Sequence, residues 1–350
     1  MNRFLKFRRI DRGLRRRQIV PCLVKHAMAE STRINPMEGA GSLFANVWKW
    51  ADFVKISHTV FALPFAIASM AVAARDQHGW PGWRRFLLIL AAMICARTCA
   101  MAFNRIADRD FDRANPRTAG RHLPTGKISL GAAWTLCLAA AAGLVGVSYC
   151  LNPLCFWLSP AALFFVCFYS LTKRFTDFTH VFLGVALALA PLGAWMAVKG
   201  NFELWPAGHG WRTMQYSAVL PLLLAAAVVF WLAGFDIIYA LQDHEFDRRQ
   251  GLHSLVVRWG VSNALSASAL AHMIMWGILA AFGFLAGFRF PYYVGLVFIL
   301  GCLVLEHWLA RRRGLRWVQH AFFRLNALIS VVFLVVTLTE IVFPFMRSKG

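Results

Sequence analysis

Long apolar runs constrain this chain more than any other feature of its sequence. The runs are about 20 residues long, which is the length that an α-helix needs to cross a bilayer, and they recur over most of the chain. Only 15% of the 350 residues are charged, whereas a soluble domain carries about a quarter. The chain is therefore predicted to be an all-α, polytopic membrane protein.

The pattern predicts a transmembrane bundle of nine helices. The third and fourth helices are separated only by Leu151 and Asn152, so they are predicted to form a tight hairpin. Several prolines fall inside or near the starts of the predicted spans. Transmembrane helices tolerate such prolines, because neighbouring helices can satisfy the backbone groups that a kink frees. The predicted spans cover residues 55–75, 86–107, 130–150, 153–172, 178–198, 216–240, 262–287, 291–310 and 321–344.

Residues 1–45 are predicted to be a basic N-terminal arm, and residues 46–350 the transmembrane domain. Six arginines lie between Arg8 and Arg17, and no apolar core with a small-residue cleavage site, as in a signal peptide, is visible. Two interpretations stay open. The arm is either a disordered or surface-lying segment that helps keep the N-terminus cytoplasmic, or partly an artefact, with translation beginning at Met28 or Met37.

Basic residues are unevenly distributed over the predicted loops. The loops that follow even-numbered spans hold Arg105, Arg109, Arg113, Arg117, Arg121, Lys127, Lys173, Arg174, Arg248, Arg249, Arg258, Arg311, Arg312, Arg313 and Arg316. The opposite loops hold Arg84, Arg85, Lys199, Arg212 and Arg289. By the positive-inside rule the first set faces the cytoplasm, together with the N-terminus.

The net charge of +21 does not indicate nucleic-acid binding. Such binding needs a solvated basic face, whereas these basic residues lie in short loops between apolar runs. Anionic membrane lipid and phosphate-bearing substrates are the predicted negative partners. The eight cysteines contain no CxxC pair, so we predict neither a disulfide framework nor a zinc site.

Two acidic motifs interrupt the apolar pattern. The first contains Asn104, Asp108 and Asp112, and the second contains Asp236, Tyr239, Asp243 and Asp247. A step of four residues turns a helical side chain by only ~40°, so each set is predicted to share one helix face. Each motif ends a span and leads into a basic loop on the cytoplasmic side. The motifs begin about 130 residues apart, which suggests two related halves.

The motifs predict a magnesium-dependent diphosphate site. Carboxylates on two facing helices suit Mg²⁺, which prefers oxygen ligands and shares them with substrate phosphates, and arginine or lysine in the loops can bind a diphosphate. The implied substrate has an apolar tail in the bilayer and a diphosphate head at the cytoplasmic rim. In the alternative interpretation, the carboxylates only pair with neighbouring arginines. Asp110 and Glu245 point away from the shared faces and are predicted to be solvated or paired in this way.

The spacing Asn104-x-x-x-Asp108-x-x-x-Asp112 and Asp236-x-x-Tyr239-x-x-x-Asp243-x-x-x-Asp247 resembles the two signature motifs of the UbiA-type intramembrane aromatic prenyltransferases. The resemblance covers nearly the whole chain from about Trp48 and includes the nine-helix count. The strings NRIADRDFDRANPRTAGRHLPTGKIS and DIIYALQDHEFDRRQGLHSL resemble the 4-hydroxybenzoate polyprenyltransferase branch. The ending GLHS is similar to a bacterial subgroup proposed to serve menaquinone synthesis.

The resemblance implies a multi-pass protein of the bacterial inner membrane that transfers a polyprenyl group to an aromatic acid in ubiquinone or menaquinone synthesis. It implies Mg²⁺ bound by Asp108 and Asp112 on one side, and by Asp243 and Asp247 on the other. Polyprenyl diphosphate bound there ionises to an allylic cation, which the ring of 4-hydroxybenzoate or a dihydroxynaphthoate attacks. Asn104 is expected to help order the first metal site or the diphosphate. Asp236 and Tyr239 are expected to orient the diphosphate or stabilise developing positive charge.

Further substrate-binding residues follow from the same resemblance. Arg97, in an otherwise apolar helix, matches an arginine placed near the aromatic acid and is assigned to its carboxylate. Lys173, four residues after Tyr169, matches a diphosphate-binding lysine, and an interfacial lysine is the alternative. The loop residues Arg117, Arg121 and Lys127 are candidates for closing over the diphosphate, and for each of them a role in topology is the alternative.

Two other functions are kept as alternatives. A transporter also uses intramembrane carboxylates, but its charges are expected at mid-span rather than at helix ends. Haem farnesyl transfer by a related enzyme fits the loop strings less well. Three histidines, His180, His272 and His307, lie in or near spans without partners at metal-ligand spacing. No protein partner is inferred.

Overall fold

The computed structural model describes residues 42–55, 61–204, 211–312 and 322–343. The predicted N-terminal arm lies almost entirely outside these residues and stays a prediction. The chain divides into two compact units, Met1–Ala51 and Asp52–Gly350. The helix α2 (Ser42–Phe53) covers the described end of the first unit and the start of the second.

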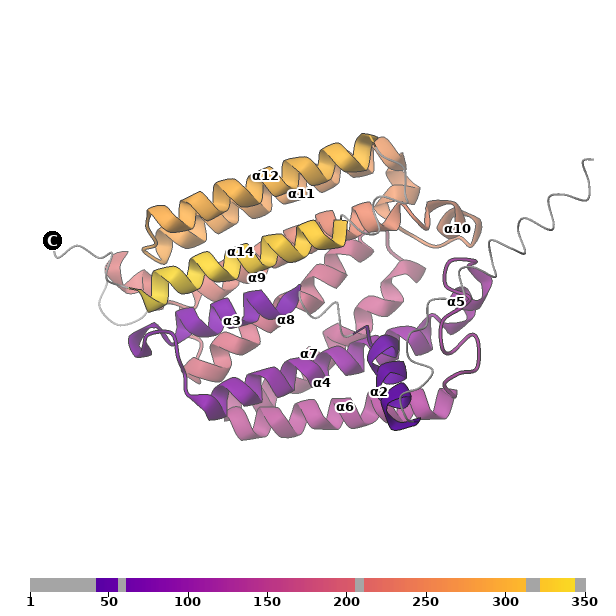
Figure 1. Ribbon diagram of the computed structural model, residues 1–350, viewed down its shortest axis with the longest axis horizontal. Helices are drawn as coiled ribbons and strands as arrows, with labels where there is room; N and C mark the ends of the chain where they lie inside the picture. The colour runs from indigo at the N-terminus through magenta and orange to yellow at the C-terminus, as the bar shows by residue number, and fades with distance from the viewer. Residues whose placement is uncertain (1–41, 56–60, 205–210, 313–321, 344–350) are drawn as a thin grey trace, which may run out of the picture. The chain divides into compact units, whose positions relative to one another are not determined.

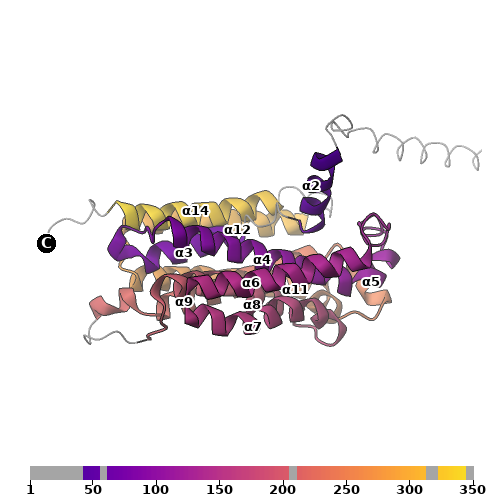
Figure 2. The ribbon, with the colours of Figure 1, turned by 90° about the horizontal axis from the view of Figure 1, so that it is seen from below.

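The described part of the second unit is helical, which confirms the predicted all-α fold. Its long helices run side by side along one axis (Figures 1 and 2). The two short helices α5 and α10 lie at the same end (Figure 1). The elements are α3 (Ala62–Ala73), η2 (Arg75–Gln77), α4 (Trp83–Ala107), α5 (Arg109–Ala114), α6 (Leu130–Leu151), α7 (Pro153–Phe168), η3 (Tyr169–Arg174), α8 (Thr179–Lys199), η4 (Trp211–Tyr216), α9 (Val219–Ala240), α10 (His244–Arg249), α11 (Leu255–Leu285), α12 (Phe290–Arg312) and α14 (Phe323–Val342).

Eight of the described helices are long and apolar enough to cross a membrane, with α7 and η3 counted together as Pro153–Arg174. The predicted first span, residues 55–75, contains α3, which has 12 residues and is too short to span on its own. Residues 56–60 and His58 among them lie outside the described part of the chain. The count of nine spans therefore stays a prediction for this first span.

The hairpin between α6 and α7 forms as predicted, and its turn also binds a third helix. Asn152 caps α7 by accepting a hydrogen bond from the backbone N–H of Cys155 (2.9 Å). Pro153 occupies the first helical turn, where its missing N–H costs nothing. The Asn152 amide then donates to the carbonyl of Met196 in α8 (2.9 Å). This short turn therefore positions three helices relative to one another.

The helix α9 lies at the centre of the bundle. In an apolar 18-residue window of α9, 61% of the window is buried inside the bundle, and in the corresponding windows of the other described spans the buried share is at most 39%. Small residues allow α9 to be buried in this way, because they let helix backbones approach closely. A Cβ on Gly184 of α8 would lie 2.7 Å from the carbonyl oxygen of Val229 in α9, and one on Gly234 would lie 2.4 Å from the ring of His272 in α11.

The close approach of α8 to α9 gives a stability prediction. Gly184→Ala is expected to destabilise the folded protein by about 1–3 kcal/mol, because the added methyl group meets rigid backbone rather than a movable side chain. Gly146→Ala in α6 is the matched control, since nothing lies within 4 Å of a Cβ there. Thermal unfolding in detergent should show a lower Tm for the first variant and an unchanged Tm for the second. Equal Tm values would contradict the tight contact.

Candidate active site

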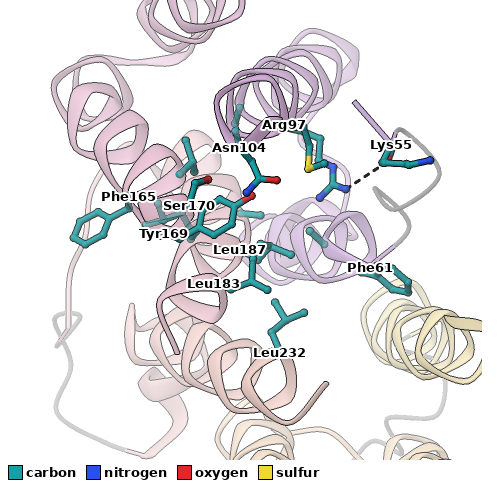
Figure 3. A pocket seen from close by; sticks show the side chains of 18 of the residues that line it. Lys55, Phe61, Arg97, Asn104, Phe165, Tyr169, Ser170, Leu183, Leu187 and Leu232 are labelled. Carbon is teal, nitrogen blue, oxygen red and sulfur yellow. Dashed lines mark hydrogen bonds between the residues drawn. The ribbon is translucent and has the colours of Figure 1, made fainter. Parts of the chain in front are cut away.

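A cavity of about 730 Å³ opens among α4, α7, α8 and α9 and carries both acidic motifs at one end. Towards the other end its lining is apolar and includes Ile89, Leu151 and Met196. Figure 3 shows side chains of α4, η3, α8 and α9 converging on this space. Of the thirteen predicted site residues, twelve line the cavity. The exception is Lys127.

The two acidic motifs fold in similar ways, but neither lies on one continuous helix, as the predicted shared face requires. At Asp108 the chain leaves α4 and enters a six-residue helix, α5. In the second motif α9 ends at Ala240, and a three-residue turn ending at Asp243 leads into another six-residue helix, α10. In both breaks the backbone N–H four residues on still donates to the aspartate carbonyl, at 2.7 Å. The bend turns both short helices over the cavity. The shared geometry agrees with the predicted relation between two halves of the chain.

The loop after the first motif reaches across to the second. The Arg117 guanidinium binds Asp243 through two nitrogens, with Nε 2.8 Å from Oδ1 and Nη2 on Oδ2. The amide of Asn115 also donates to Oδ1 of Asp243 (3.0 Å). Arg117 further donates to the Tyr239 hydroxyl (3.2 Å). These contacts hold the two motifs together at one end of the bundle.

Three of the other four motif carboxylates, Asp108, Asp112 and Asp247, meet arginine or lysine. Asp112 accepts from Arg121 (2.6 Å), and Asp108 accepts from Arg174 (3.1 Å). The Lys173 ammonium lies 3.3 Å from Asp247. The site therefore contains four carboxylate–cation pairs, and three of them join different elements of the fold.

Burial changes the acidity of these carboxylates differently. Burial raises the pKa of Asp108, and Arg174 only partly opposes this. Burial likewise raises the pKa of Asp247, against the effect of Lys173. For Asp243 burial acts in the same direction, but the hydrogen bonds and charge of Arg117 outweigh it and the pKa is lowered. Asp108 and Asp247 thus carry negative charge that their present partners compensate incompletely, and a cation at the site would favour their ionised forms.

The carboxylate oxygens of the site suit a hard divalent cation that takes its remaining ligands from substrate and water. Oδ2 of Asp112 is buried and has no hydrogen-bond partner among the described residues, so one carboxylate oxygen is free to bind a metal. Within the same residues, no group of three or more acidic, histidine or cysteine side chains is arranged to hold a metal ion alone. The fit is therefore to Mg²⁺ held by pairs of carboxylates and completed by substrate phosphate and water.

Two arginines that line the cavity lack an acidic partner within the described residues. Arg105 is buried, and its side chain makes no ion pair or hydrogen bond in that part of the chain. Arg97 also lines the cavity; its Nη2 makes only a long hydrogen bond to the Lys55 carbonyl (3.4 Å, Figure 3). Asn104 and Tyr169 lie beside the same space (Figure 3). Buried cations without a partner favour an anionic ligand.

Three predicted residues lie away from the cavity. Lys127 is exposed and does not line it, because Gly126 (φ 73°) and a hydrogen bond from Ile128 N–H to the His122 carbonyl turn the loop outward. Asp110 and Glu245 are exposed, as predicted, and pair with Arg109 and Arg249.

Sequence reasoning missed four residues that the structure adds to the site. Arg174 and Arg105 were interpreted only as loop charges, and Asn115 was not singled out. His180 was noted only as lacking partners at metal-ligand spacing, and its Nδ1 lies 2.7 Å from Asp236. No spacing rule could find these contacts, because each joins segments more than 50 residues apart or depends on where a helix ends. The only sequence signal for these residues was the position of Arg105 and Arg174 at the ends of apolar spans.

The GLHS string also has a structural role at the site. The backbone N–H of His253 donates to the carbonyl of Lys173 (2.8 Å), and the His253 ring lies 3.0 Å from Asp177. The two contacts join the loop after α10 to η3 and to the segment that follows it. They hold the backbone of Lys173 next to Asp247.

Comparisons with known proteins find similar sequences and structures over most of the chain. The sequence model of the UbiA prenyltransferase family matches residues 62–328. The 4-hydroxybenzoate octaprenyltransferase of Paraburkholderia phymatum is 32% identical over 288 residues, which cover 81% of this chain and 93% of that protein. The enzyme of the same name from Pseudomonas aeruginosa strain UCBPP-PA14 is 30% identical over 298 residues, covering 83% and 92%.

Solved structures have the same fold. The apo structure of a UbiA homologue from Aeropyrum pernix K1 superimposes with a TM-score of 0.70 at 31% identity, covering 81% of this chain and 98% of that one. A UbiA homologue from Archaeoglobus fulgidus, bound to GPP and Mg²⁺, superimposes with a TM-score of 0.63 at 21% identity, covering 84% and 99%. At that identity the second likeness extends to the fold alone.

Proposed function

Because the chain belongs to the UbiA prenyltransferase family, whose sequence model matches residues 62–328, we propose that it transfers a polyprenyl group from polyprenyl diphosphate to a hydroxylated aromatic acid. The chain is a multi-pass membrane prenyltransferase. The proposal concerns the two substrates, the metal and the residues that bind them. The observation that carries it is the set of four carboxylate–cation pairs at one end of a largely apolar cavity.

The polar end of the cavity is the proposed diphosphate site. Asp108 and Asp112 would hold one Mg²⁺, and Asp243 and Asp247 another, as the free Oδ2 of Asp112 favours. Mg²⁺ bound there would neutralise the diphosphate charge and so make it a better leaving group. The A. fulgidus homologue binds GPP together with Mg²⁺, which supports this choice of metal and donor class.

The basic residues of the site are proposed to bind the diphosphate. Arg117, Arg121 and Lys173 now face carboxylates, and they would turn to phosphate oxygens once cations occupy those carboxylates. Asn104 donates to Oδ2 of Asp108 (3.0 Å) and would fix its orientation. The ring face of Tyr239 would stabilise the positive charge that develops as the allylic C–O bond breaks. The prenyl tail would lie along the apolar part of the cavity.

The aromatic acid is proposed to bind deeper, near Arg97. Its carboxylate would pair with the Arg97 guanidinium, which has no acidic partner in the described part of the chain, and Tyr169 would line the same pocket. Ring attack on the allylic carbon then forms the new C–C bond. The curated relatives named 4-hydroxybenzoate octaprenyltransferase favour 4-hydroxybenzoate, and the GLHS string favours a dihydroxynaphthoate. Quinone synthesis, an inner-membrane location and a cytoplasmic N-terminus belong to the same proposal.

One assay tests this function directly. Purified protein in detergent with Mg²⁺ and octaprenyl diphosphate is expected to prenylate either 4-hydroxybenzoate or a dihydroxynaphthoate, detected by mass spectrometry of the product. Offering both acceptors together measures the ratio of their kcat/KM values and so decides between them. Release of diphosphate without a prenylated aromatic product would refute the acceptor class. A transporter, the alternative function, would form no prenylated product in this assay.

A further inference from the structure

One buried ionisable pair borders the cavity and is not among the residues proposed above to bind the metal and the diphosphate. His180 of α8 is 0% exposed, and its Nδ1 lies 2.7 Å from Oδ2 of Asp236 in α9. Asp236 lines the cavity, and its side chain is 19% exposed. Burying an ionisable pair among membrane helices is costly, which favours a functional role for a pair that also borders the cavity.

Only one oxygen of Asp236 is engaged. Oδ2 bonds to His180, whereas Oδ1 has no hydrogen-bond partner within the described residues. An ionised carboxylate can only accept, so we assign the proton of the shared bond to Nδ1 of His180. The other ring nitrogen, Nε2, is buried and unpartnered in the same part of the chain. The pair therefore presents one free basic oxygen at the cavity wall.

The position of Asp236 suits a group that acts on the acceptor rather than on the diphosphate. It lies four residues before the end of α9 at Ala240, about 6 Å deeper along the helix axis. Apart from His180, its electrostatic neighbours include Lys173 and Asp243, both of which belong to the diphosphate site proposed above. Asp236 is thus the carboxylate nearest the apolar part of the cavity that is not committed to a metal.

The proposed reaction needs a base at that depth. When the ring attacks the allylic carbon, a C–C bond forms and one ring carbon carries both the prenyl group and its original hydrogen. The ring regains aromaticity only when that C–H bond breaks and its electron pair returns to the ring. The diphosphate has by then left with the electron pair of the C–O bond, so one proton remains to be accepted.

We propose that Asp236 accepts this proton on Oδ1 and that His180 positions it. The Nδ1–H bond of His180 fixes the orientation of the Asp236 carboxylate and leaves Oδ1 directed at the cavity. His180 does not touch the substrate, so it is a positioning residue, whereas Asp236 is a catalytic one. The inference rests on the proposed function, because it requires an aromatic acceptor.

An acceptor deuterated at the attacked ring position tests the assignment. In the wild type, kcat is expected to be equal for the two isotopic forms, because proton loss follows the slower ionisation. Asp236→Asn is expected to lower kcat by about 10²–10⁴-fold, the range contributed by a general base, with the acceptor KM nearly unchanged. Proton loss then limits turnover, and the deuterated acceptor should react several-fold more slowly.

Variants of His180 test whether its side chain positions Asp236 or only packs against it. His180→Leu removes the donor and should show both the lower kcat and the isotope effect. His180→Gln retains an N–H donor and should recover most of the lost activity. The matched control is His272→Gln, another buried histidine, bonded to His307 and to the Trp231 carbonyl and outside the cavity lining. It is expected to change Tm without producing an isotope effect.

Two results would overturn the inference. If Asp236→Asn lowers kcat and the isotope effect stays absent, Asp236 is not the proton acceptor. If His180→Leu keeps wild-type kcat, His180 does not position it. A wild-type protein that forms no prenylated aromatic product would instead refute the proposed function, and that failure is visible before any variant is made.

Discussion

Replacing Asp112 by asparagine should lower kcat/KM for polyprenyl diphosphate by at least about 10³-fold, equivalent to about 4 kcal/mol of transition-state stabilisation. The variant keeps the size and hydrogen-bonding shape of the side chain but removes the negative charge that would hold Mg²⁺. Oδ2 of Asp112 is buried without a partner in the described residues, so this atom has no structural bond to lose. The loss should therefore appear in catalysis and not in folding. Steady-state kinetics in detergent measures it.

Asp110→Asn is the matched control for this variant. Asp110 lies two residues away in the same short helix, is exposed and, within the described residues, pairs with Arg109 alone. Its replacement should change kcat/KM less than about fivefold, since exposed ion pairs contribute at most about 1 kcal/mol. The second motif offers the same comparison between Asp247 and Glu245, which is also exposed. If the Asp110 and Asp112 variants had equal activity, the proposed metal assignment would be wrong.

Removing divalent cations with a chelator should abolish turnover while leaving the protein folded. The reaction requires the negative charge of the diphosphate to be neutralised. The four basic residues of the ion pairs cannot do this alone, because each of them is paired with a carboxylate. When the metal is absent, the same pairs neutralise the charge of the carboxylates. Activity is therefore expected to fall to background with EDTA and to return in full on adding excess Mg²⁺.

Thermal unfolding provides the structural readout for the chelator experiment. Proteins that depend on a structural metal unfold when it is removed. Here the Tm in EDTA is expected to stay within a few degrees of its value in Mg²⁺, because the bundle is held by the burial of α9 and not by the metal. Adding Mg²⁺ with a non-hydrolysable diphosphate analogue should raise the Tm through ligand binding. Full activity in EDTA would contradict a metal-dependent mechanism.

Sequence reasoning found most of the site because its signals are local. The spans followed from hydropathy, the hairpin from the two residues between the third and fourth predicted spans, and the motif carboxylates from their spacing of four. Each of these depends on neighbours within a few turns of one helix, where the periodicity of the backbone determines which side chains share a face. The family resemblance then added residues such as Arg97 and Tyr169, which single-helix periodicity could not have assigned.

What the sequence by itself determined was a multi-pass helical bundle carrying two acidic motifs, because transfer of apolar helices into a bilayer depends on composition and length. Only the tertiary structure decided which cation meets which carboxylate, that both motifs break their helices, and that His180 lies against Asp236. Those contacts join segments far apart in the chain. Their geometry is set by how closely helices such as α8 and α9 pack, and no periodicity within one helix encodes that distance.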